Sequence, residues 1–424
     1  MRNLFIISML VLFAQTSFAG QYIVKFKNPI STKNLNTIKA ITNGEVESLI
    51  PQLNMAVISG QPTQINTLSL SMGNEIEYIE VNHKRYAIGK KGPSYPSEVN
   101  MWGMRAINAL PAWAITKGSR KVIIAVSDTG TWLEHSDLKN NLWRNAGETG
   151  LDANGKDKTK NKIDDDGNGY IDDVHGYNFE TNVGNPMENH YHGTHVAGSI
   201  GAVGNNSGIA GVNWETSLMT VKFIGMDGSG TDDAAIKSIV YAADNGAKVI
   251  NASWGGDEFA QALYDAIDYA GKKGVLFVAA SGNDGQNADK YPMYPAAYDL
   301  DSIISVASIS DVKGKLSGFS NYGAKSVDIA APGENIYSTW NPMQSPLRRV
   351  LYYTISGTSM AAPHVTGVVG LMYAANPNLT SKQVKSILIE TAKLTPHLTG
   401  KVLANGMVDA GAAVKKAKEL AGSN

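Results

Sequence analysis

Ser359 is the residue of this chain best suited to act as a nucleophile. It stands in the run GTSMAAPH, which begins at Gly357 and opens a long apolar helical segment. A serine hydroxyl is a weak nucleophile, so it needs a base, a group that orients the base, and donors for the oxyanion that its attack creates. If Ser359 reacts, other segments of the chain must supply those groups.

Three segments offer groups of these types. His192 begins a second helix of small residues, HGTHVAG, and could serve as the base. Asp128 ends the continuous apolar strand KVIIAVSD and could orient the histidine. Asn283 follows the apolar run VAASG and carries an amide that can donate to an oxyanion. In open α/β sheets, catalytic groups collect at the carboxyl ends of strands, where Asp128 and Asn283 both fall.

The order of these residues distinguishes between classes of serine hydrolase. Asp128, His192 and Ser359 follow one another in the order Asp, His, Ser, unlike the chymotrypsin and α/β-hydrolase orders. Ala361 also replaces the last glycine of the G-x-S-x-G elbow of α/β-hydrolases. The three segments resemble, in order, the signature blocks of the subtilisin-like serine proteases, and the resemblance covers roughly residues 100 to 420.

The resemblance implies a role for each of the four residues. Ser359 would attack the peptide carbonyl, His192 would carry the proton, Asp128 would orient the imidazole, and Asn283 would bind the oxyanion. Taken singly, each residue could be structural, as we expect for His195, one helical turn beyond His192. A calcium-dependent binding protein without catalysis is one alternative, against which the intact triad argues. An esterase or lipase is another, against which the missing elbow argues.

Composition points to a secreted enzyme. The chain has 424 residues, 43% hydrophobic, a formal net charge of -1 and no cysteine. Because it lacks long basic runs, we expect neither a nucleic-acid partner nor binding to a membrane. Residues 1–19 combine Arg2, a short apolar core and small residues, the parts of a secretory signal peptide. We therefore expect a secreted monomer, extracellular or periplasmic.

A separate compositional block follows, at residues 20–92. Its alternating segments QYIVKFK and IEYIEV, with helical patterns between them, predict a small α+β unit. The block resembles the inhibitory prosegments of subtilisin-like proteases, which implies a ferredoxin-like fold and inhibition of its own enzyme. A permanent N-terminal domain is the alternative. We expect Ser359 itself to cut the segment from Arg85 to Ser97, leaving residues 93–424 as the peptidase domain.

Beyond that linker, strand and helix patterns alternate. Thr231 and Thr380 are expected to cap two of the helices. Five apolar runs without polar alternation predict parallel strands buried on both faces, at 121–127, 217–223, 247–252, 275–280 and 303–308. Together they predict a three-layer α/β fold with a mainly parallel sheet and helices on both faces, as in subtilisin-like proteases.

The resemblance also implies two segments that bind an extended peptide by main-chain hydrogen bonds. They run from Lys222 to Gly230 and from Ala252 to Gly256, and their glycines permit the close approach of another backbone. Trp254 and Met293 would lie near specificity pockets, although packing in the core or a loop explains them equally well. The candidate substrate-binding residues are Gly228, Ser253, Trp254, Gly255 and Met293.

A polar insertion between Asp128 and His192 predicts a calcium site. Its run DDDGNGYIDD spaces oxygen atoms on alternate residues and places Gly169 where a calcium loop turns sharply. The run resembles the first nine positions of an EF-hand loop, but His175 replaces the final glutamate, so the last ligand must come from elsewhere, such as Asp173. An acidic solvated loop is the alternative. The candidate ligands are Asp164, Asp166, Asn168, the Tyr170 carbonyl and Asp172.

The resemblance implies a second calcium site. Asp137 and the loop VGNNSGI match the aspartate and the loop that hold the family's tight calcium. Several ligands would be main-chain carbonyls. The candidate residues are Asp137, Val203, Asn205, Ser207 and Ile209.

These features predict a secreted serine endopeptidase, stabilised by one or two calcium ions and made as a self-processing zymogen. It would cleave polypeptide substrates through an acyl-enzyme intermediate.

Overall fold

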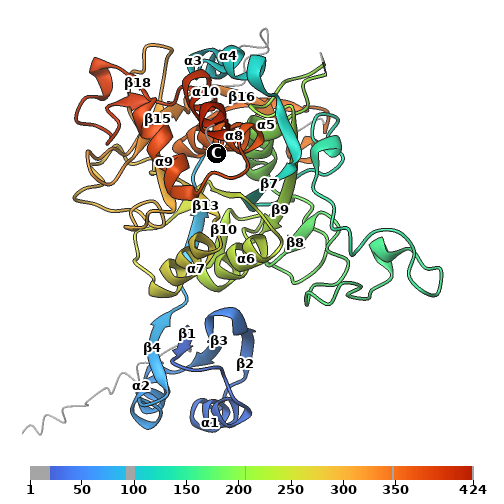
Figure 1. The fold of residues 1–424 in the computed structure, drawn as a ribbon. Coiled ribbons are helices and arrows are strands. Elements are labelled where there is room, and N and C mark those ends of the chain that lie inside the picture. Colours follow the sequence, from blue (N-terminus) through green and yellow to red (C-terminus); the bar gives the residue numbers. More distant parts are fainter. Residues whose placement is uncertain (1–19, 92–100, 206, 346–347, 423–424) are drawn as a thin grey trace, which may run out of the picture. The chain divides into compact units, whose positions relative to one another are not determined.

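The computed structural model describes residues 20–91, 101–205, 207–345 and 348–422 (Figure 1). The chain divides into two compact units, the first ending at Asn82 and the second beginning at His83. Two sequence predictions fall outside the described residues, in whole or in part: the signal peptide at 1–19, and the part of the predicted cleavage segment from Gly92 to Ser97.

The first unit is a four-stranded antiparallel sheet with two helices. Its sheet order is β2-β3-β1-β4, and β1 pairs antiparallel with both β3 and β4. The β-α-β-β-α-β order is that of ferredoxin-like folds, as the sequence predicts. The elements are β1 (Gly20–Phe26), α1 (Thr32–Thr42), β2 (Val46–Ile50), β3 (Met55–Gly60), α2 (Pro62–Ser71) and β4 (Ile76–Val81).

The apolar alternation of these strands supplies the core of the first unit. Side chains on one face of the sheet are buried against the two helices, as the period of two along a strand requires. The core contains Val24, Phe26, Ile38, Ala56, Ile58 and Leu68.

A nine-stranded sheet organises the described part of the second unit, in the order β18-β19-β15-β14-β13-β11-β7-β9-β8. Neighbouring strands are parallel except β18 and β19. The five predicted strands all lie in this sheet. Its strands are β7 (Gly118–Asp128), β8 (Gly176–Asn178), β9 (Glu215–Lys222), β11 (Val249–Ala252), β13 (Leu276–Ala280), β14 (Ile303–Ile309), β15 (Ile329–Pro332), β18 (Lys393–Leu394) and β19 (Gly406–Met407).

Helices cover both faces of this sheet (Figure 1). One layer holds α5 (His192–Gly201) and α8 (Thr358–Ala375), with α10 (Ala410–Ala421) packed on α8; the other holds α6 (Asp232–Asp244) and α7 (Gln261–Lys272). Helix α8 is buried over nearly its whole length, because it is apolar all round and crosses several strands. The remaining α-helices are α3 (Trp102–Ala106), α4 (Ala109–Ile115) and α9 (Ser381–Glu390).

The two predicted helix caps have different outcomes. Thr380 and Gln383 form a capping box at the start of α9, as predicted. Thr231 is the N-cap residue of α6, as predicted, but its hydroxyl makes no capping bond and donates instead to the Asp233 carboxylate, at 2.6 Å. The polar side chains in the first turn of α6 are therefore its two acidic residues, Asp232 and Asp233.

Two small sheets lie beside the main one. The first has the order β10-β5-β12 and contains β5 (Lys84–Ala87), β10 (Ser229–Thr231) and β12 (Trp254–Gly255). The second has the order β16-β17-β6 and contains β6 (Lys90–Lys91), β16 (Ile336–Thr339) and β17 (Tyr352–Ser356). Short 3-10 helices are η1 (Pro51–Leu53), η2 (Lys139–Asn141), η3 (Lys158–Lys160), η4 (Pro342–Gln344) and η5 (Pro396–Leu398).

None of the helices in the described part of the chain is long and apolar enough to cross a membrane.

Candidate active site

A buried hydrogen-bonded pair lies where β7 ends and α5 begins. Asp128, the last residue of β7, has no exposed surface, and His192, the first residue of α5, is 1% exposed. His192 Nδ1 lies 2.8 Å from Asp128 Oδ1 and 3.1 Å from Oδ2. The Thr129 amide donates to Asp128 Oδ1 at 2.7 Å. The carboxylate is thus fixed on one side and orients the imidazole on the other.

These contacts determine the direction in which the pKa of His192 shifts. Burial lowers the pKa of His192, but the charge of Asp128, the hydrogen bond to it, the charge of Glu188 and the Ile88 main chain together outweigh burial, so the net pKa is raised. His192 Nε2 has no hydrogen-bond partner among the described residues. A histidine with one nitrogen anchored and the other open can accept a proton there.

His195 has the opposite character. Its Nε2 atom lies 3.0 Å from the Ile336 carbonyl and 3.2 Å from the Tyr353 carbonyl. Burial lowers the pKa of His195 to about 3, so the ring is neutral. This is the packed core histidine that the sequence predicts.

Ser359 is the second residue of α8, and the proline four residues later leaves its carbonyl without the usual helical hydrogen bond. Pro363 has no N–H, so it cannot bond the Ser359 carbonyl as a normal helix residue would. Ser253 Oγ donates to that carbonyl instead, at 2.8 Å. The Ser359 hydroxyl in turn donates to the Ser253 carbonyl at 2.9 Å. This exchange joins the start of α8 to the segment that follows β11.

The Asn283 amide has a defined orientation. Its Oδ1 atom accepts hydrogen bonds from the Thr358 amide at 2.9 Å and the Thr358 hydroxyl at 3.0 Å. The Nδ2 donor therefore points the other way, where it donates to the Ile88 carbonyl at 3.2 Å.

One peptide bond, Ile88–Gly89, lies among all of these groups. The one hydrogen of the Ser359 hydroxyl can be shared with, or turned to, a second acceptor, the Ile88 carbonyl oxygen, which is also the atom that the Asn283 amide binds. Gly89 lies so close to His192 that a Cβ atom on it would be 2.9 Å from His192 Cδ2. The structure thus brings a hydroxyl, an imidazole and an amide donor together around a single carbonyl group.

The residues before this peptide bond run through the site as a strand. In β5, Arg85 pairs with Gly230 of β10 and Tyr86 with Gly255 of β12, both antiparallel. The Ala87 amide donates to the Gly228 carbonyl at 3.0 Å, and the Ile88 amide to the Ser253 carbonyl at 3.2 Å. Beyond the bond, β6 pairs with β17. A peptide is thus held on both sides by main-chain hydrogen bonds.

The other two candidate substrate residues differ in what they present. The backbone of Trp254 pairs with Ala87, but its side chain is fully buried against Phe223 and Phe277, with ring centroids 4.9 and 6.3 Å away. Packing in the core therefore accounts for the Trp254 side chain. Met293 lies beside Gly255, on the cavity that Ile88 also lines.

Comparison with known proteins agrees with this geometry. Residues 119–416 match the model of the subtilase family of peptidases. The chain belongs to the subtilase family. Thermitase of Thermoactinomyces vulgaris is 38% identical over 315 residues, which cover 74% of this chain and 95% of thermitase. The family-level fold prediction is confirmed.

Two longer subtilases are also similar. Subtilisin-like protease 1 of Plasmodium berghei (strain Anka) is 36% identical over 315 residues, covering 69% of this chain and 49% of that protein. The chain thus spans about half the length of that relative. The crystal structure of fervidolysin from Fervidobacterium pennivorans, described as a keratinolytic enzyme related to subtilisin, matches with a TM-score of 0.75 and 25% identity, over 94% of this chain and 61% of that one.

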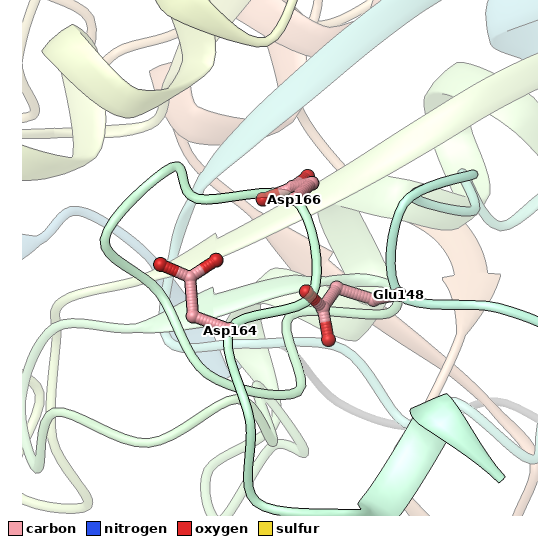
Figure 2. A group of neighbouring side chains, drawn as sticks. All are labelled: Glu148, Asp164 and Asp166. Carbon is pink, nitrogen blue, oxygen red and sulfur yellow. The ribbon is translucent and has the colours of Figure 1, made fainter. Parts of the chain in front are cut away.

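An acidic group lies in the insertion between β7 and α5. Ligand oxygens of Glu148, Asp164 and Asp166 all lie within 4.8 Å of one another, and Figure 2 shows the three carboxylates facing a common space. Glu148 has no exposed surface, and its Oε2 atom has no hydrogen-bond partner among the described residues. Burial raises the pKa of Glu148, and the charges of neighbouring aspartates, Asp173 among them, raise it further. The hydrogen bond from the Asp165 amide lowers this pKa but does not cancel the rise.

The predicted ligand loop is only partly in this group. The Asp164 carboxylate accepts the amides of Gly167 and Gly169, each at 2.8 Å, which closes the predicted turn. Asp172 lies outside the group and accepts the Lys162 amide at 3.2 Å. Glu148 was missed because it precedes the loop by 16 residues and belongs to no local motif.

The rest of this loop is tied to the buried Asp173. Asn168 Oδ1 accepts the Tyr170 amide at 2.7 Å, and Asn168 Nδ2 donates to Asp173 at 3.0 Å. Tyr241 and Asn145 also donate to Asp173, at 2.5 and 2.7 Å. Because protein donors already satisfy Asp173, it is less suited than Glu148 to complete a cation site.

The second predicted calcium site stays a prediction. The structure brings Asp137 beside the 203–209 loop, where the Val203 amide donates to the Asp137 carbonyl at 2.8 Å. Asp137 Oδ2 accepts the Ile209 amide and the Tyr352 hydroxyl, each at 2.9 Å. Asn205 Oδ1 accepts the Ser207 amide at 3.0 Å.

Glu188 is a supporting residue that sequence reasoning missed. It is 3% exposed, and its Oε1 accepts the Thr129 hydroxyl at 2.5 Å and the Gly193 amide at 2.9 Å. The Thr194 hydroxyl donates to Oε2. Glu188 therefore ties the residue after Asp128 to the first turn of α5, which carries His192. Burial raises the pKa of Glu188 to about 7, although these donors oppose the change.

We expect Glu188→Gln to change how stability depends on pH. Because the native state holds the Glu188 proton more tightly than the unfolded state, the wild type should lose up to about 3 kcal/mol as pH rises from 4.5 to 7. Glutamine cannot titrate, so the variant should lack this decline. Thermal unfolding across this range, in a Ser359→Ala background that prevents self-digestion, measures the difference. If the stability of the two proteins changed with pH in parallel, the raised pKa assigned to Glu188 would be contradicted.

Proposed function

We propose that this protein is a secreted serine endopeptidase that cleaves polypeptides by acyl transfer. The observation that carries the proposal is the Ile88 carbonyl, which accepts hydrogen bonds from both Ser359 and Asn283. A nucleophile and an oxyanion donor on the same carbonyl are what acyl transfer requires. Secretion follows from the signal peptide predicted for residues 1–19.

Each residue then has one step. Ser359 Oγ attacks the carbonyl carbon while His192 Nε2 takes its proton, and Asp128 orients and stabilises the resulting imidazolium. Asn283 and the Ser359 amide stabilise the oxyanion. His192 returns the proton to the leaving amine, and water releases the acyl group by the same sequence.

The contacts along residues 84–91 favour a peptidase over the two alternatives. An esterase or lipase needs a pocket for an acyl chain, whereas this site pairs with a backbone on both sides of the reacting carbonyl. A binding protein without catalysis has no need of the anchored imidazole with its free Nε2.

We further propose that the protein is a zymogen that cuts its own Ile88–Gly89 bond. Residues 83–88 occupy the positions of a substrate before the cleaved bond, and β6 those after it. Residues 20–88 would then be the prosegment, which inhibits as a product-like peptide until it is released.

We also propose a structural calcium ion at Glu148, Asp164 and Asp166. Oxygen ligands are those that calcium prefers, and several close carboxylates repel one another without a cation. The unpartnered, buried Glu148 oxygen fits a ligand better than a solvated acidic loop. The ion would stabilise the native state and take no part in the reaction.

Ser359→Ala should abolish peptidase activity and block processing. The wild type should begin at Gly89 or within the linker after it, whereas the variant should keep residues 20–88 attached. N-terminal sequencing and casein hydrolysis measure both effects, and fragment 20–88 added in trans should inhibit the wild type. Full activity from a chain that still carries the block covalently would refute the zymogen proposal and leave the catalytic one intact.

Asn283→Ala should lower kcat by about 10² to 10³ with little change in KM, a magnitude borrowed from an oxyanion donor of subtilisin, which is itself a subtilase. The amide stabilises charge that develops only in the transition state. Steady-state kinetics on one peptide measure both constants, with the melting temperature as a check on folding. A change confined to KM would assign Asn283 to ground-state binding.

Calcium removal should lower the melting temperature of the Ser359→Ala protein. An ion that binds only the native state contributes about 2.7 kcal/mol when its concentration is about 100 times Kd. Glu148→Gln combined with Asp166→Asn should reduce this effect, while Asp172→Asn, outside the group, serves as the control. An unchanged melting temperature after EDTA treatment would exclude a stabilising calcium ion.

A further inference from the structure

Arg85 is a fully buried arginine in the segment that occupies the site. It has no exposed surface and is among the largest fully buried side chains of the protein. Arginine is almost never buried unless it is paired. Its neighbours in β5 point outward: Lys84 is exposed, and Tyr86 is 52% exposed. Arg85 is therefore the residue of β5 that the protein encloses.

The enclosing pocket matches a guanidinium group. Arg85 Nε lies 2.5 Å from Asp232 Oδ1, and Nη2 lies 3.0 Å from Oδ2, so the pair is bidentate. Nη1 donates to the Glu258 carbonyl at 2.9 Å. A Cβ atom on Gly256 would lie 3.0 Å from Nη1, so the glycine leaves the space that the head group fills. The planar fork of arginine fits such a site, whereas the point charge of lysine does not.

Arg85 has a fixed place relative to the proposed cleavage. The carbonyl bound by Ser359 and Asn283 belongs to Ile88, so Arg85 is the fourth residue before the bond, counting Ile88 as the first. Pairing of β5 with β10 and β12 sets this register. Any peptide that pairs in the same register places its fourth residue at Asp232.

The carboxylate of this pocket does not belong to the segment that occupies it. Asp232 is the first residue of α6, and it has no exposed surface. Burial raises the pKa of Asp232 even with the Arg85 guanidinium beside it. Without Arg85 the Asp232 carboxylate would lose its bidentate partner, so release of the segment would leave a site that favours another guanidinium.

We propose that Asp232 is a specificity-determining residue that selects arginine as the fourth residue before the cleaved bond of substrates. The segment Arg85-Tyr86-Ala87-Ile88 then marks the preferred substrate sequence as well as the site of self-processing. This inference rests on the proposed endopeptidase function. It extends that function to a substrate class, polypeptides with an arginine three residues before the residue whose carbonyl is attacked.

Four quenched fluorescent peptides spanning His83–Lys91 test the selection on the wild-type enzyme, without any protein variant. They are the native sequence and its Arg85→Met, Arg85→Lys and Tyr86→Ser forms. Losing one partner of a buried charge pair should lower kcat/KM for the Arg85→Met peptide at least about 30-fold. The kcat/KM of the Arg85→Lys peptide should lie between those of the native and Arg85→Met peptides. The Tyr86→Ser peptide should have the kcat/KM of the native one, because the Tyr86 side chain is exposed.

Two enzyme variants assign the selection to Asp232. The Asp232→Asn enzyme should cleave the Arg85→Met peptide as fast as the wild type does but lose its preference for the native peptide. The Asp233→Asn enzyme, altered at the next residue of the same helical turn, should keep the preference. Equal kcat/KM of the wild type for the native and Arg85→Met peptides would overturn the inference while leaving the endopeptidase intact. Cleavage of none of the peptides, with no difference between wild type and Ser359→Ala, would overturn both.

Discussion

Buried negative charge is the constraint on which the site and its surroundings depend. Asp128, Glu148 and Asp232 have no exposed surface, and Glu188 is 3% exposed. Each carboxylate would be costly to bury without compensation. Asp128 is compensated by His192, Glu188 by amides and hydroxyls of the turn beside it, and Asp232 by Arg85. Glu148 has neighbouring acids instead of a cation, which is the basis of the calcium site proposed there.

The second organising interaction is backbone pairing along the cleft. Residues 84–87 pair with β10 and β12, and β6 pairs with β17, so the Ile88 carbonyl is held between two short antiparallel sheets. Main-chain hydrogen bonds of this kind bind many sequences alike. They place the carbonyl at Ser359, while selection among sequences must come from pockets such as the one formed by Asp232.

Most of the fold could be predicted from the sequence because its signals are local. The runs that become β7 and β13 lack polar alternation, since parallel strands are buried on both faces, and each delivers a polar residue at its carboxyl end. The order Asp128, His192, Ser359 needs no distance to be recognised. The contribution of Glu148 could not be predicted, because its place beside Asp166 depends on how an irregular loop folds back.

The contacts of Arg85 could not be predicted from the sequence either. Arg85 and Asp232 are 147 residues apart and carry no motif, and a shift of β5 by one residue would turn Arg85 outward. Thr231 illustrates it locally, because a hydroxyl expected to cap α6 bonds to Asp233 instead. Sequence patterns identify which residues a strand or helix will bury, but pairing across the cleft depends on register.

The partners of these buried carboxylates differ in whether the protein can lose them. His192 belongs to α5, so it cannot leave Asp128, which suits a pair that must hold one geometry. The donors to Glu188 come from Thr129 and from the first turn of α5, and they are equally permanent. Arg85 is different, because it precedes the proposed cleavage site and would leave with the proposed prosegment. A carboxylate whose partner is permanent keeps one set of contacts, whereas one whose partner departs is open to a replacement. Asp232 is the buried carboxylate of this cleft with that property, and the geometry built around Arg85 decides which replacement fits.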